Sequence, residues 1–592
     1  MCAAVEPQTP LARRAAALGV ATSYQDWADR TVAVDEQVVA AVLAQLGDEP
    51  WAARPEVRGV PRLTAPPRCW GWSVQLYALH SAGSWGLGDL ADLRELAVRS
   101  AREFGADLIL VNPLHAVAPV LPITDSPYSP TSRRYVNVLY LRIEQIAEYA
   151  SAPTEVRARV DALRPPPPNP TGLLDRDLVW TAKIAALQEL WPHARPVDLD
   201  ADADLLDFAT FCALAEKYDV PWQAWPEDLR RPDGAGILAV RERLADRVRF
   251  HAWLQVLCDE QLAAVQQAAL DAGMRIGIVH DLAVGVDPGG ADAWALQDVL
   301  AGEVTVGAPP DSFNQRGQDW ALPPWRPDAL SRSEFAPYRA MLTAILARGG
   351  GVRVDHVMGL SRLWWVPPGH SPDAGTYVSY DEAALLDLLV ELASARGAIV
   401  VGEDLGTVEP RMRTALTERG ILGSAVLWFE RAGDRPDGPP KAPTDWRELA
   451  MASISTHDLP TAHGWLAGEQ VRVRAELGQL GRPVETEREA ASHERALMRS
   501  ALLEQGVLGP DDAGDPDAVV LAMHSYLAAS PARVLLASPY DVLGELRQPN
   551  LPGTTDEYPN WRLPLGVSLD ALLSDPRVAA TAAVLRRGSR DT

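Results

Sequence analysis

The chain has 592 residues, 47% of them hydrophobic, which is enough to bury the core of a large domain and leave residues for additional segments. Asp and Glu number 79 against 55 Lys and Arg, and the formal net charge of -24 repels phosphate backbones and anionic lipid. Nucleic acid and membrane surfaces are therefore excluded as expected partners. The charge neither supports nor excludes a neutral polar substrate.

The cysteines and the apolar runs predict a reducing, aqueous compartment. Cys2, Cys69, Cys212 and Cys258 are scattered, with no CxxC pair and no spacing typical of a zinc site. The first residues lack a basic region followed by an apolar core, and no apolar run reaches the ~18 residues that span a bilayer. We expect free thiols, no metal site, and a soluble cytoplasmic protein.

The N-terminal region, residues 1–47, is predicted to be a small helical cap. Two amphipathic helical patterns, LARRAAALGV and DEQVVAAVLAQLG, lie there, and Asp35 and Gly47 fit the N-cap and the stop of the second. Residues 48–69 are rich in Pro and Arg. Because each proline blocks a helix or a central strand, we expect an extended linker. The main domain is expected over residues 70–592.

The main domain contains eight apolar runs that predict β-strands, separated by helical patterns. This order predicts an α/β fold of the (β/α)8 TIM-barrel class. The runs lie at residues 72–79, 107–114, 275–284, 351–358, 398–404, 424–429, 451–456 and 533–538. The second, third and fourth runs are too far apart for single crossover helices, so we expect insertions at about 116–255 and 285–345.

The two insertions differ in composition. The first contains RPPPPNPTG, a stiff polyproline-like loop, followed by helical patterns such as LVWTAKIAALQEL. The second contains GAPPDSFNQRGQDWALPPW, whose content of Gly, Pro and Trp predicts neither a helix nor a strand. We expect this second segment to form a lid or to line a substrate site.

Three of the predicted strands end in groups of polar side chains. Asp355 and His356 end the run GVRVDH, Glu403 follows AIVVG, and His457 and Asp458 end MASISTHD. The C-terminal ends of the strands of a barrel meet at one face, which carries the catalytic residues of such folds. We therefore expect these side chains to converge on one pocket.

Asp355 and Glu403 fit the cleavage of an acetal, which needs an acid for the leaving oxygen and a second carboxylate at the carbon. Arg353 lies two residues before Asp355 on the same strand face, and its charge is expected to keep Asp355 ionised, as a nucleophile requires. Glu403 follows an apolar run, and a drier setting there would raise its pKa towards the acid role.

Each of these residues also has a structural interpretation. Arg353 and Asp355 could form a buried ion pair, and Glu403 could simply be solvated. Asp458 could cap the segment LPTAHGWL, and His457 could be an ordinary hydrogen-bonded histidine. The three strand ends taken together favour the catalytic interpretation.

The chain has 19 tryptophans, and aromatic faces are suitable platforms for sugar rings. Trp320 lies in the Gly/Pro-rich segment, where no packing period surrounds it, and it is the best candidate for such a platform. Trp364 and Trp365 are interpreted as packing residues. Asp404 is interpreted as a support for the structure, before a helical pattern that starts near Thr407.

The motifs after residue 70 resemble the 4-α-glucanotransferase family, also called amylomaltase or disproportionating enzyme, within the α-amylase-like barrel group. The resemblance covers nearly all of the chain after that point. As a set the motifs are specific, whereas any one of them alone is weak. They are SWGLGDL, DSPYSPTS, HDLAVGVDPGGADAW, GAPPD, GQDW, VRVDHVMG, GEDLG, STHD and NLPGTTDEYPNWR.

The resemblance implies roles for individual residues. Asp355 is implied to be the nucleophile, Glu403 the general acid/base, and Asp458 the stabiliser of the transition state. The residues implied to bind the sugar at the cleavage point are Arg353, His356 and His457, and those implied to line the rest of the pocket are Asp281, Tyr128, Asp311, Gln318, Trp320 and Asn550.

The resemblance also implies the reaction, a retaining transfer of α-1,4-glucan segments to the 4-hydroxyl of glucose or another α-1,4-glucan. The implied intermediate is a covalent glycosyl-aspartate, the partners are maltooligosaccharides and α-1,4-glucans, and no cofactor is required. Two alternatives remain, an α-glucan hydrolase in which water replaces the acceptor and a non-catalytic glucan-binding protein. The three carboxylates argue against the latter. The sequence makes no prediction of the oligomeric state.

The chain departs from the pattern of the family at the third predicted strand, among other positions. Many relatives have Gly-Asp-Leu-Pro where this chain has His280, Asp281, Leu282 and Ala283. Because the reacting residues remain, the departure resembles a variant branch of the family.

Overall fold

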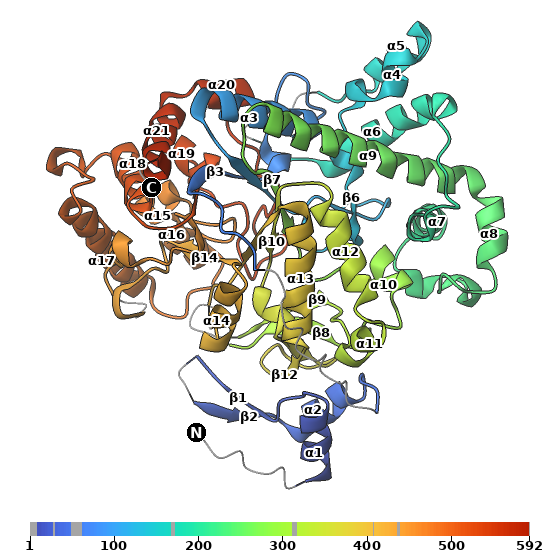
Figure 1. Ribbon diagram of the computed structural model, residues 1–592, viewed down its shortest axis with the longest axis horizontal. Helices are drawn as coiled ribbons and strands as arrows, with labels where there is room; N and C mark the ends of the chain where they lie inside the picture. The colour runs from blue at the N-terminus through green and yellow to red at the C-terminus, as the bar shows by residue number, and fades with distance from the viewer. Residues whose placement is uncertain are drawn as a thin grey trace.

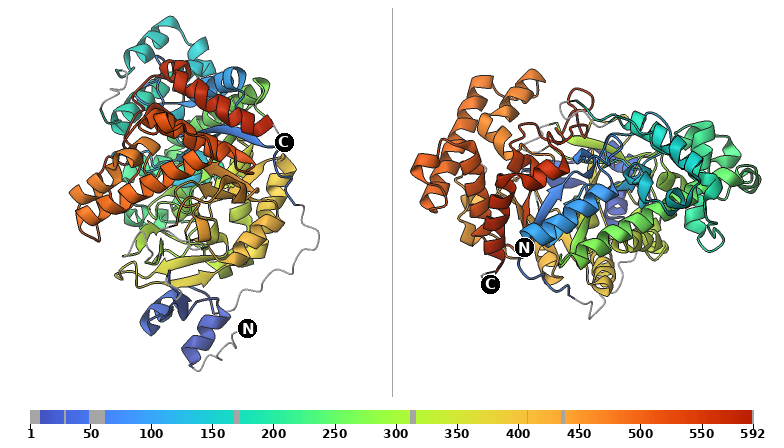
Figure 2. Two further views of the ribbon diagram at one scale, coloured as in Figure 1. Left: turned by 90° about the vertical axis from the view of Figure 1, so that its left-hand side faces the viewer. Right: turned by 90° about the horizontal axis from the view of Figure 1, so that it is seen from above.

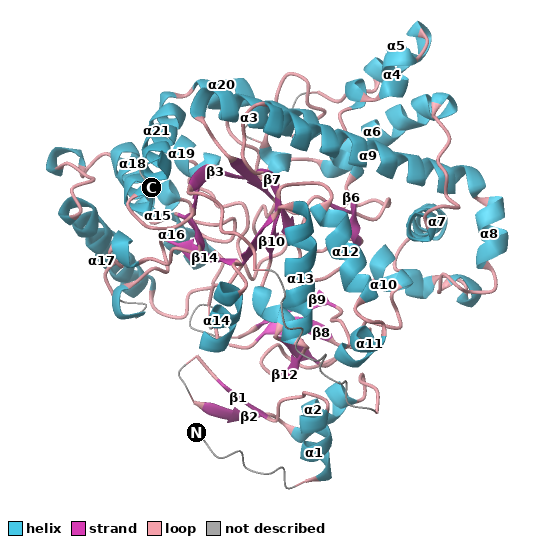
Figure 3. Cartoon of the chain, viewed as in Figure 1, coloured by secondary structure: helices cyan, strands magenta, loops and turns pink. Residues whose placement is uncertain are grey.

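A computed structural model describes residues 9–27, 30–48, 62–166, 172–310, 316–406, 408–434 and 438–590. At its centre eight parallel strands close into a barrel, drawn in magenta in Figure 3 with helices around it. The predicted (β/α)8 fold is confirmed. In chain order the strands are β3 (Cys69–Val74), β4 (Leu108–Val111), β7 (Gly277–Leu282), β10 (Gly351–Val354), β13 (Ile399–Gly402), β14 (Leu422–Val426), β15 (Ala450–Ser453) and β16 (Val534–Ala537).

The barrel closes between its first and last strands, β3 and β16. Val534 pairs with Cys69, and Leu536 pairs with Gly71. Apolar side chains fill the interior. Helices cover the outer face of each barrel strand and these side chains pack against the inner face, so both faces are buried. This interior cluster contains Cys69, Leu108, Leu110, Val279, Ile399, Val401, Leu422, Met451, Val534 and Leu536.

Helices cover the outside of the barrel. They are α3 (Leu90–Arg99), α9 (Ala245–Asp271), α12 (Ala336–Leu346), α13 (Glu382–Arg396), α14 (Pro410–Glu418), α18 (Pro516–Ala528) and α21 (Pro576–Arg590). The connection from β14 to β15 differs, since its described residues, 427–434 and 438–449, contain no α-helix. None of the described helices combines the length and the apolar character needed to cross a membrane.

Long connections extend from the barrel on opposite sides (Figures 1 and 2). Between β4 and β7 lie the paired strands β5 (His115–Ala116) and β6 (Ser132–Val136), and the helices α4 (Ala147–Ser151), α5 (Thr154–Ala162), α6 (Arg176–Leu190), α7 (Ala203–Tyr218) and α8 (Ile237–Arg243). The opposite side carries α15 (Ala462–Ala467), α16 (Glu469–Glu476) and α17 (Val484–Glu504), which separate β15 from β16. The last elements are α19 (Pro539–Leu543) and α20 (Leu569–Ser574).

A second, four-stranded antiparallel sheet has the order β12-β11-β8-β9. Its strands come from the connections after β7 and β10, namely β8 (Thr305–Ala308), β9 (Gln318–Leu322), β11 (Arg362–Val366) and β12 (Thr376–Ser379). The connection after β7 also contains α10 (Ala291–Ala295) and α11 (Pro327–Arg332).

This sheet corrects the expectation that the Gly/Pro/Trp-rich segment contains neither helix nor strand. Gln318–Leu322 is a strand because β8 supplies a hydrogen-bonding partner that composition does not reveal. A register shift between Val306 and Gly307 and a positive φ of 57° at Ala321 accommodate the irregular sequence. Trp364 and Trp365 lie in β11 and are buried, as the packing interpretation predicted.

The N-terminal residues contain α1 (Pro10–Ala17) and α2 (Glu36–Leu43), and Asp35 caps α2 as predicted. Between the helices, β1 (Ser23–Gln25) and β2 (Thr31–Ala33) form an antiparallel pair that was not predicted. This part packs along β12, at the bottom of Figure 1, where Ala21 donates to the Tyr377 carbonyl and Ser379 donates to the Gly19 carbonyl. The second sheet thus links the N-terminal residues to the barrel.

Candidate active site

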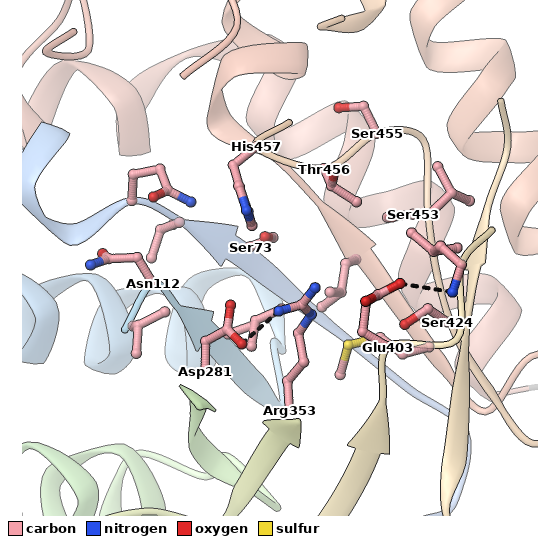
Figure 4. A pocket seen from close by; sticks show the side chains of 18 residues that line it. Ser73, Asn112, Asp281, Arg353, Glu403, Ser424, Ser453, Ser455, Thr456 and His457 are labelled. Carbon is pink, nitrogen blue, oxygen red and sulfur yellow. Dashed lines mark hydrogen bonds and ion pairs between the residues drawn. The ribbon is translucent and has the colours of Figure 1, made fainter. Parts of the chain in front are cut away.

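A polar cavity lies at the C-terminal end of the barrel strands (Figure 4). Each of the eight strands, or the residues that follow it, contributes to its lining. Arg353 comes from β10, and Glu403 follows β13. His457 belongs to the residues after β15. The other polar residues of the lining are Ser73, Gln75, Asn112, Asp281, Ser424, Ser453, Ser455 and Thr456.

Arg353 holds two carboxylates on adjacent strands. Its Nη1 atom lies 2.6 Å from Oδ1 of Asp281 and 3.1 Å from Oδ1 of Asp355. Figure 4 shows Arg353 reaching Asp281 across the floor of the cavity. Arg353 stands opposite Asp281 in the parallel pairing of β10 with β7, so the barrel register places these charges together. The ion pair exists, and it also faces the cavity.

The charge of Asp355 differs from the prediction. The pKa of Asp355 is raised to about 7, chiefly by burial; Arg353 lowers it, and the negative charges of Asp281 and Glu403 oppose that lowering. Arg353 favours the ionised form of Asp355, as expected, but the expectation that Asp355 stays permanently ionised was wrong. Because Arg353 divides its charge between two carboxylates, it compensates only part of the cost of burying them.

Glu403 is held by backbone donors rather than by solvent. Its Oε2 accepts a hydrogen bond of 3.0 Å from the amide of His356, and its Oε1 accepts one of 2.7 Å from the amide of Leu405. Burial raises the pKa of Glu403, although Arg353 and these two donors oppose the shift. With Asp355 also raised, the two carboxyls retain a proton into the neutral range.

Asp458 lies beside a histidine and an asparagine. Asn550 donates a hydrogen bond of 2.6 Å to its Oδ1, and Nε2 of His457 lies 3.4 Å from its Oδ2. Burial opposes ionisation, but the charge and hydrogen bond of His457 together with Asn550 hold the pKa of Asp458 below its ordinary value. Asp458 is not the cap of the following helix, because Thr461 caps α15.

Aromatic rings form a wall beside these groups. Tyr128 stacks on His457 with ring centres 5.0 Å apart, and its hydroxyl donates a hydrogen bond of 2.7 Å to Asp281. Trp561 lies 5.3 Å from both rings. Sequence reasoning missed Trp561, although it lies inside the motif NLPGTTDEYPNWR. Its φ of 62°, unusual for a bulky residue, was not readable from the sequence.

The second sheet brings Trp320 and Gln318 to the same site. The indole of Trp320 packs edge-on against His356, with ring centres 5.2 Å apart, and its Nε1 donates to the Gln318 side chain over 3.2 Å. His356 has a positive φ of 44°, a strained conformation for a residue other than glycine. Asp311 lies outside the described residues.

Asp404, next to Glu403, has the structural role that was predicted. It is buried and accepts a hydrogen bond of 2.7 Å from the amide of Ser424, and it pairs with Arg447. Among the described residues, no group of three or more His, Cys, Asp and Glu side chains is arranged to hold a metal ion.

Comparison with known proteins adds to this geometry. A family model described as 4-alpha-glucanotransferase matches residues 74–568. A 4-alpha-glucanotransferase of Mycobacterium bovis is 48% identical over 557 residues, which cover 90% of this chain and 77% of the relative. The crystal structure of amylomaltase from Corynebacterium glutamicum is 31% identical, has a TM-score of 0.84, and covers 97% of this chain and 99% of that chain.

A second solved structure supports the fold alone. Amylomaltase from Streptococcus agalactiae, in complex with acarbose, has a TM-score of 0.71 at 16% identity, and the match covers 89% of this chain and 100% of that chain. The barrel and the segments around it therefore belong to a known architecture.

Proposed function

The chain belongs to the 4-alpha-glucanotransferase family, and on that premise we propose that it moves α-1,4-glucan segments from maltooligosaccharides to the 4-hydroxyl of glucose or another α-1,4-glucan. The observation that carries this proposal is the pairing of Asp355 and Glu403 on adjacent strands. Their joint burial keeps a proton on the pair, and acetal cleavage needs one protonated and one ionised carboxyl.

In the first step, Asp355 attacks the anomeric carbon of the donor while Glu403 protonates the glycosidic oxygen that leaves. The proton retained by the pair thus passes to the leaving sugar, and the donor remains bound to Asp355 as an ester. In the second step, Glu403 takes the proton of an acceptor 4-hydroxyl, whose oxygen displaces Asp355. Two displacements retain the anomeric configuration.

Asp458 stabilises the positive charge that develops at the anomeric carbon in both steps. Its low pKa keeps it ionised for this role. Arg353 and His457 bind the sugar at the cleavage point together with His356. Further sugar contacts come from Asp281, Tyr128, Gln318, Trp320 and Asn550. We extend the same role to Asp311, which lies outside the described residues.

We extend the proposal to the organisation of the chain. Residues 1–47 form a cap, residues 48–69 a linker, and residues 70–592 the catalytic barrel with insertions at about 116–255 and 285–345. The protein acts in the cytoplasm without a cofactor.

The products formed from maltotriose test the proposal. Transfer conserves the number of reducing ends, whereas hydrolysis adds one for each bond that is cut. We expect glucose together with a ladder of longer maltooligosaccharides, while the total of reducing ends stays nearly constant. A steady rise in reducing ends without longer products would show a hydrolase instead.

A further inference from the structure

Asp541 joins the two ends of the loop that carries His457 and Asp458. It lies in α19, directly after β16, and is 1% exposed. Its Oδ1 accepts a hydrogen bond of 2.6 Å from the amide of Ala462, and its Oδ2 accepts one of 3.3 Å from the hydroxyl of Ser455. One carboxylate therefore links residue 455, at the start of the loop, to residue 462, at its end.

The middle of the same loop is held by a different segment. The amide of Asn550 donates a hydrogen bond of 3.0 Å to the carbonyl of His457, and the Gln548 side chain donates one of 3.1 Å to the carbonyl of Asp458. The Asn550 side chain also donates a hydrogen bond of 2.6 Å to the carboxylate of Asp458, and Thr461 donates one of 2.6 Å to the Glu545 carbonyl. The bonds at Asp541 add a direct link between the start of the loop and its end.

Burying a carboxyl at this position is costly. Burial raises the pKa of Asp541 to about 6, although Ala462, Ser455 and His463 all favour its ionised form. An apolar residue would avoid this cost but would leave the Ala462 amide and the Ser455 hydroxyl without an acceptor. Ser455 also lines the catalytic cavity, so the contact with Asp541 lies next to the reacting groups.

We propose that Asp541 is a positioning residue for the transfer reaction, which sets where Asp458 and His457 stand relative to Asp355 and Glu403. The inference rests on the proposed function. Asp541 does not touch substrate; it acts through the ends of the loop. A displacement of about 1 Å in such a loop lowers turnover by roughly 100-fold.

A graded set of variants tests this role. Asp541→Ala removes both hydrogen bonds, and we expect kcat for maltotriose disproportionation to fall about 100-fold while KM changes by less than about threefold. Asp541→Asn recovers most of this loss, because its amide oxygen accepts from Ala462 and its amide nitrogen donates to Ser455. Ser455→Ala removes one bond and lowers kcat by about tenfold.

The double variant Ser455→Ala/Asp541→Ala distinguishes a shared contact from two separate ones. If Ser455 acts through Asp541, the double variant is no slower than Asp541→Ala alone. Losses that simply multiply would overturn the inference.

Asp328→Ala is the matched control for loss of stability. Asp328 is also 1% exposed, and it binds Arg326, Arg332 and the Gly47 amide beside the N-terminal helices. We expect this variant to lower the melting temperature and to leave kcat of the folded protein unchanged. If Asp541→Ala behaves in the same way, Asp541 only stabilises the fold and the inference is wrong.

Failure of this inference can be distinguished from failure of the proposed function. If Asp541→Ala does not fold, Ser455→Ala decides, since it keeps the carboxylate, and an unchanged kcat in that variant overturns the inference. If the unmodified protein forms no longer maltooligosaccharides, the proposed function fails instead.

Discussion

The amide nitrogen of His356 donates a hydrogen bond of 3.0 Å to Oε2 of Glu403. His356 follows Asp355 directly, and the amide of Glu403 in turn donates to the Val354 carbonyl over 2.9 Å. The backbone on either side of Asp355 therefore fixes the position of Glu403. His356, whose N–H makes this bond, has a strained φ of 44°, a conformation that costs about 1–3 kcal/mol.

Replacing Asp355 by Asn should leave the fold intact, since the two side chains have nearly the same shape. Without a nucleophile, we expect glucose release from maltotriose to fall by about 10⁴-fold or more. Mass spectrometry of the protein with a slow donor should then show no glycosyl adduct. Detecting that adduct on the Asn variant would refute the role of Asp355.

Replacing Glu403 by Gln should matter most for donors whose leaving group needs a proton. General acid catalysis contributes about 10²–10⁴-fold, so we expect transfer from maltotriose to fall by about 10³-fold. An α-glucosyl fluoride donor should lose less than about tenfold in fluoride release, because fluoride leaves without protonation. Glu409→Gln, on the same connection, is the control. Equal losses with both donors would contradict the acid role.

The basic limb of the pH profile should follow the proton that Asp355 and Glu403 share. The pKa of Asp355 is raised to about 7, so above that pH the pair loses the proton that the leaving sugar needs, and kcat/KM should fall towards tenfold per pH unit. Asp281 contributes to this rise and competes for Arg353, so Asp281→Asn should move the limb to lower pH while also lowering the rate. A limb that stays in place or moves to higher pH would show that Asp281 does not influence Asp355.

Trp320 should act on the acceptor side of the site. A sugar acceptor gains from an aromatic surface, whereas water does not, so Trp320→Ala should lower transfer about tenfold more than hydrolysis. Trp27→Ala, which removes a tryptophan that is 52% exposed in the N-terminal residues, is the control. Parallel losses of transfer and hydrolysis would make Trp320 a structural residue.

The sequence predicted what depends on local pattern. The strands that carry Arg353 and precede Glu403 are buried on both faces, so they read as apolar runs with polar residues at their ends. Parallel strands of one barrel bring such ends together, whatever the length of the insertions between them. The convergence of Arg353, Glu403 and His457 on one cavity follows from this rule.

What depended on distant partners was not predictable. β9 is a strand only because β8 lies beside it, and the Gly, Pro and Trp residues around it concealed the pairing. The pKa of Asp355 was misjudged because Asp281, which competes for Arg353, comes from another strand. Trp561 was missed because its place in the wall depends on a positive φ and on contacts with Tyr128 and His457.

The closing pair of the barrel also determines when the protein can fold. Cys69 on β3 pairs with Val534 on β16, so the ring stays open until nearly the whole chain has been synthesised. The N-terminal helices also cannot pack in place early, because β12, against which they lie, is synthesised much later. Pairings across such separations form slowly, and unpaired strand edges attract other chains. We therefore expect newly made chains to expose unpaired strand edges until β16 has been synthesised, and aggregation during expression to begin at this stage.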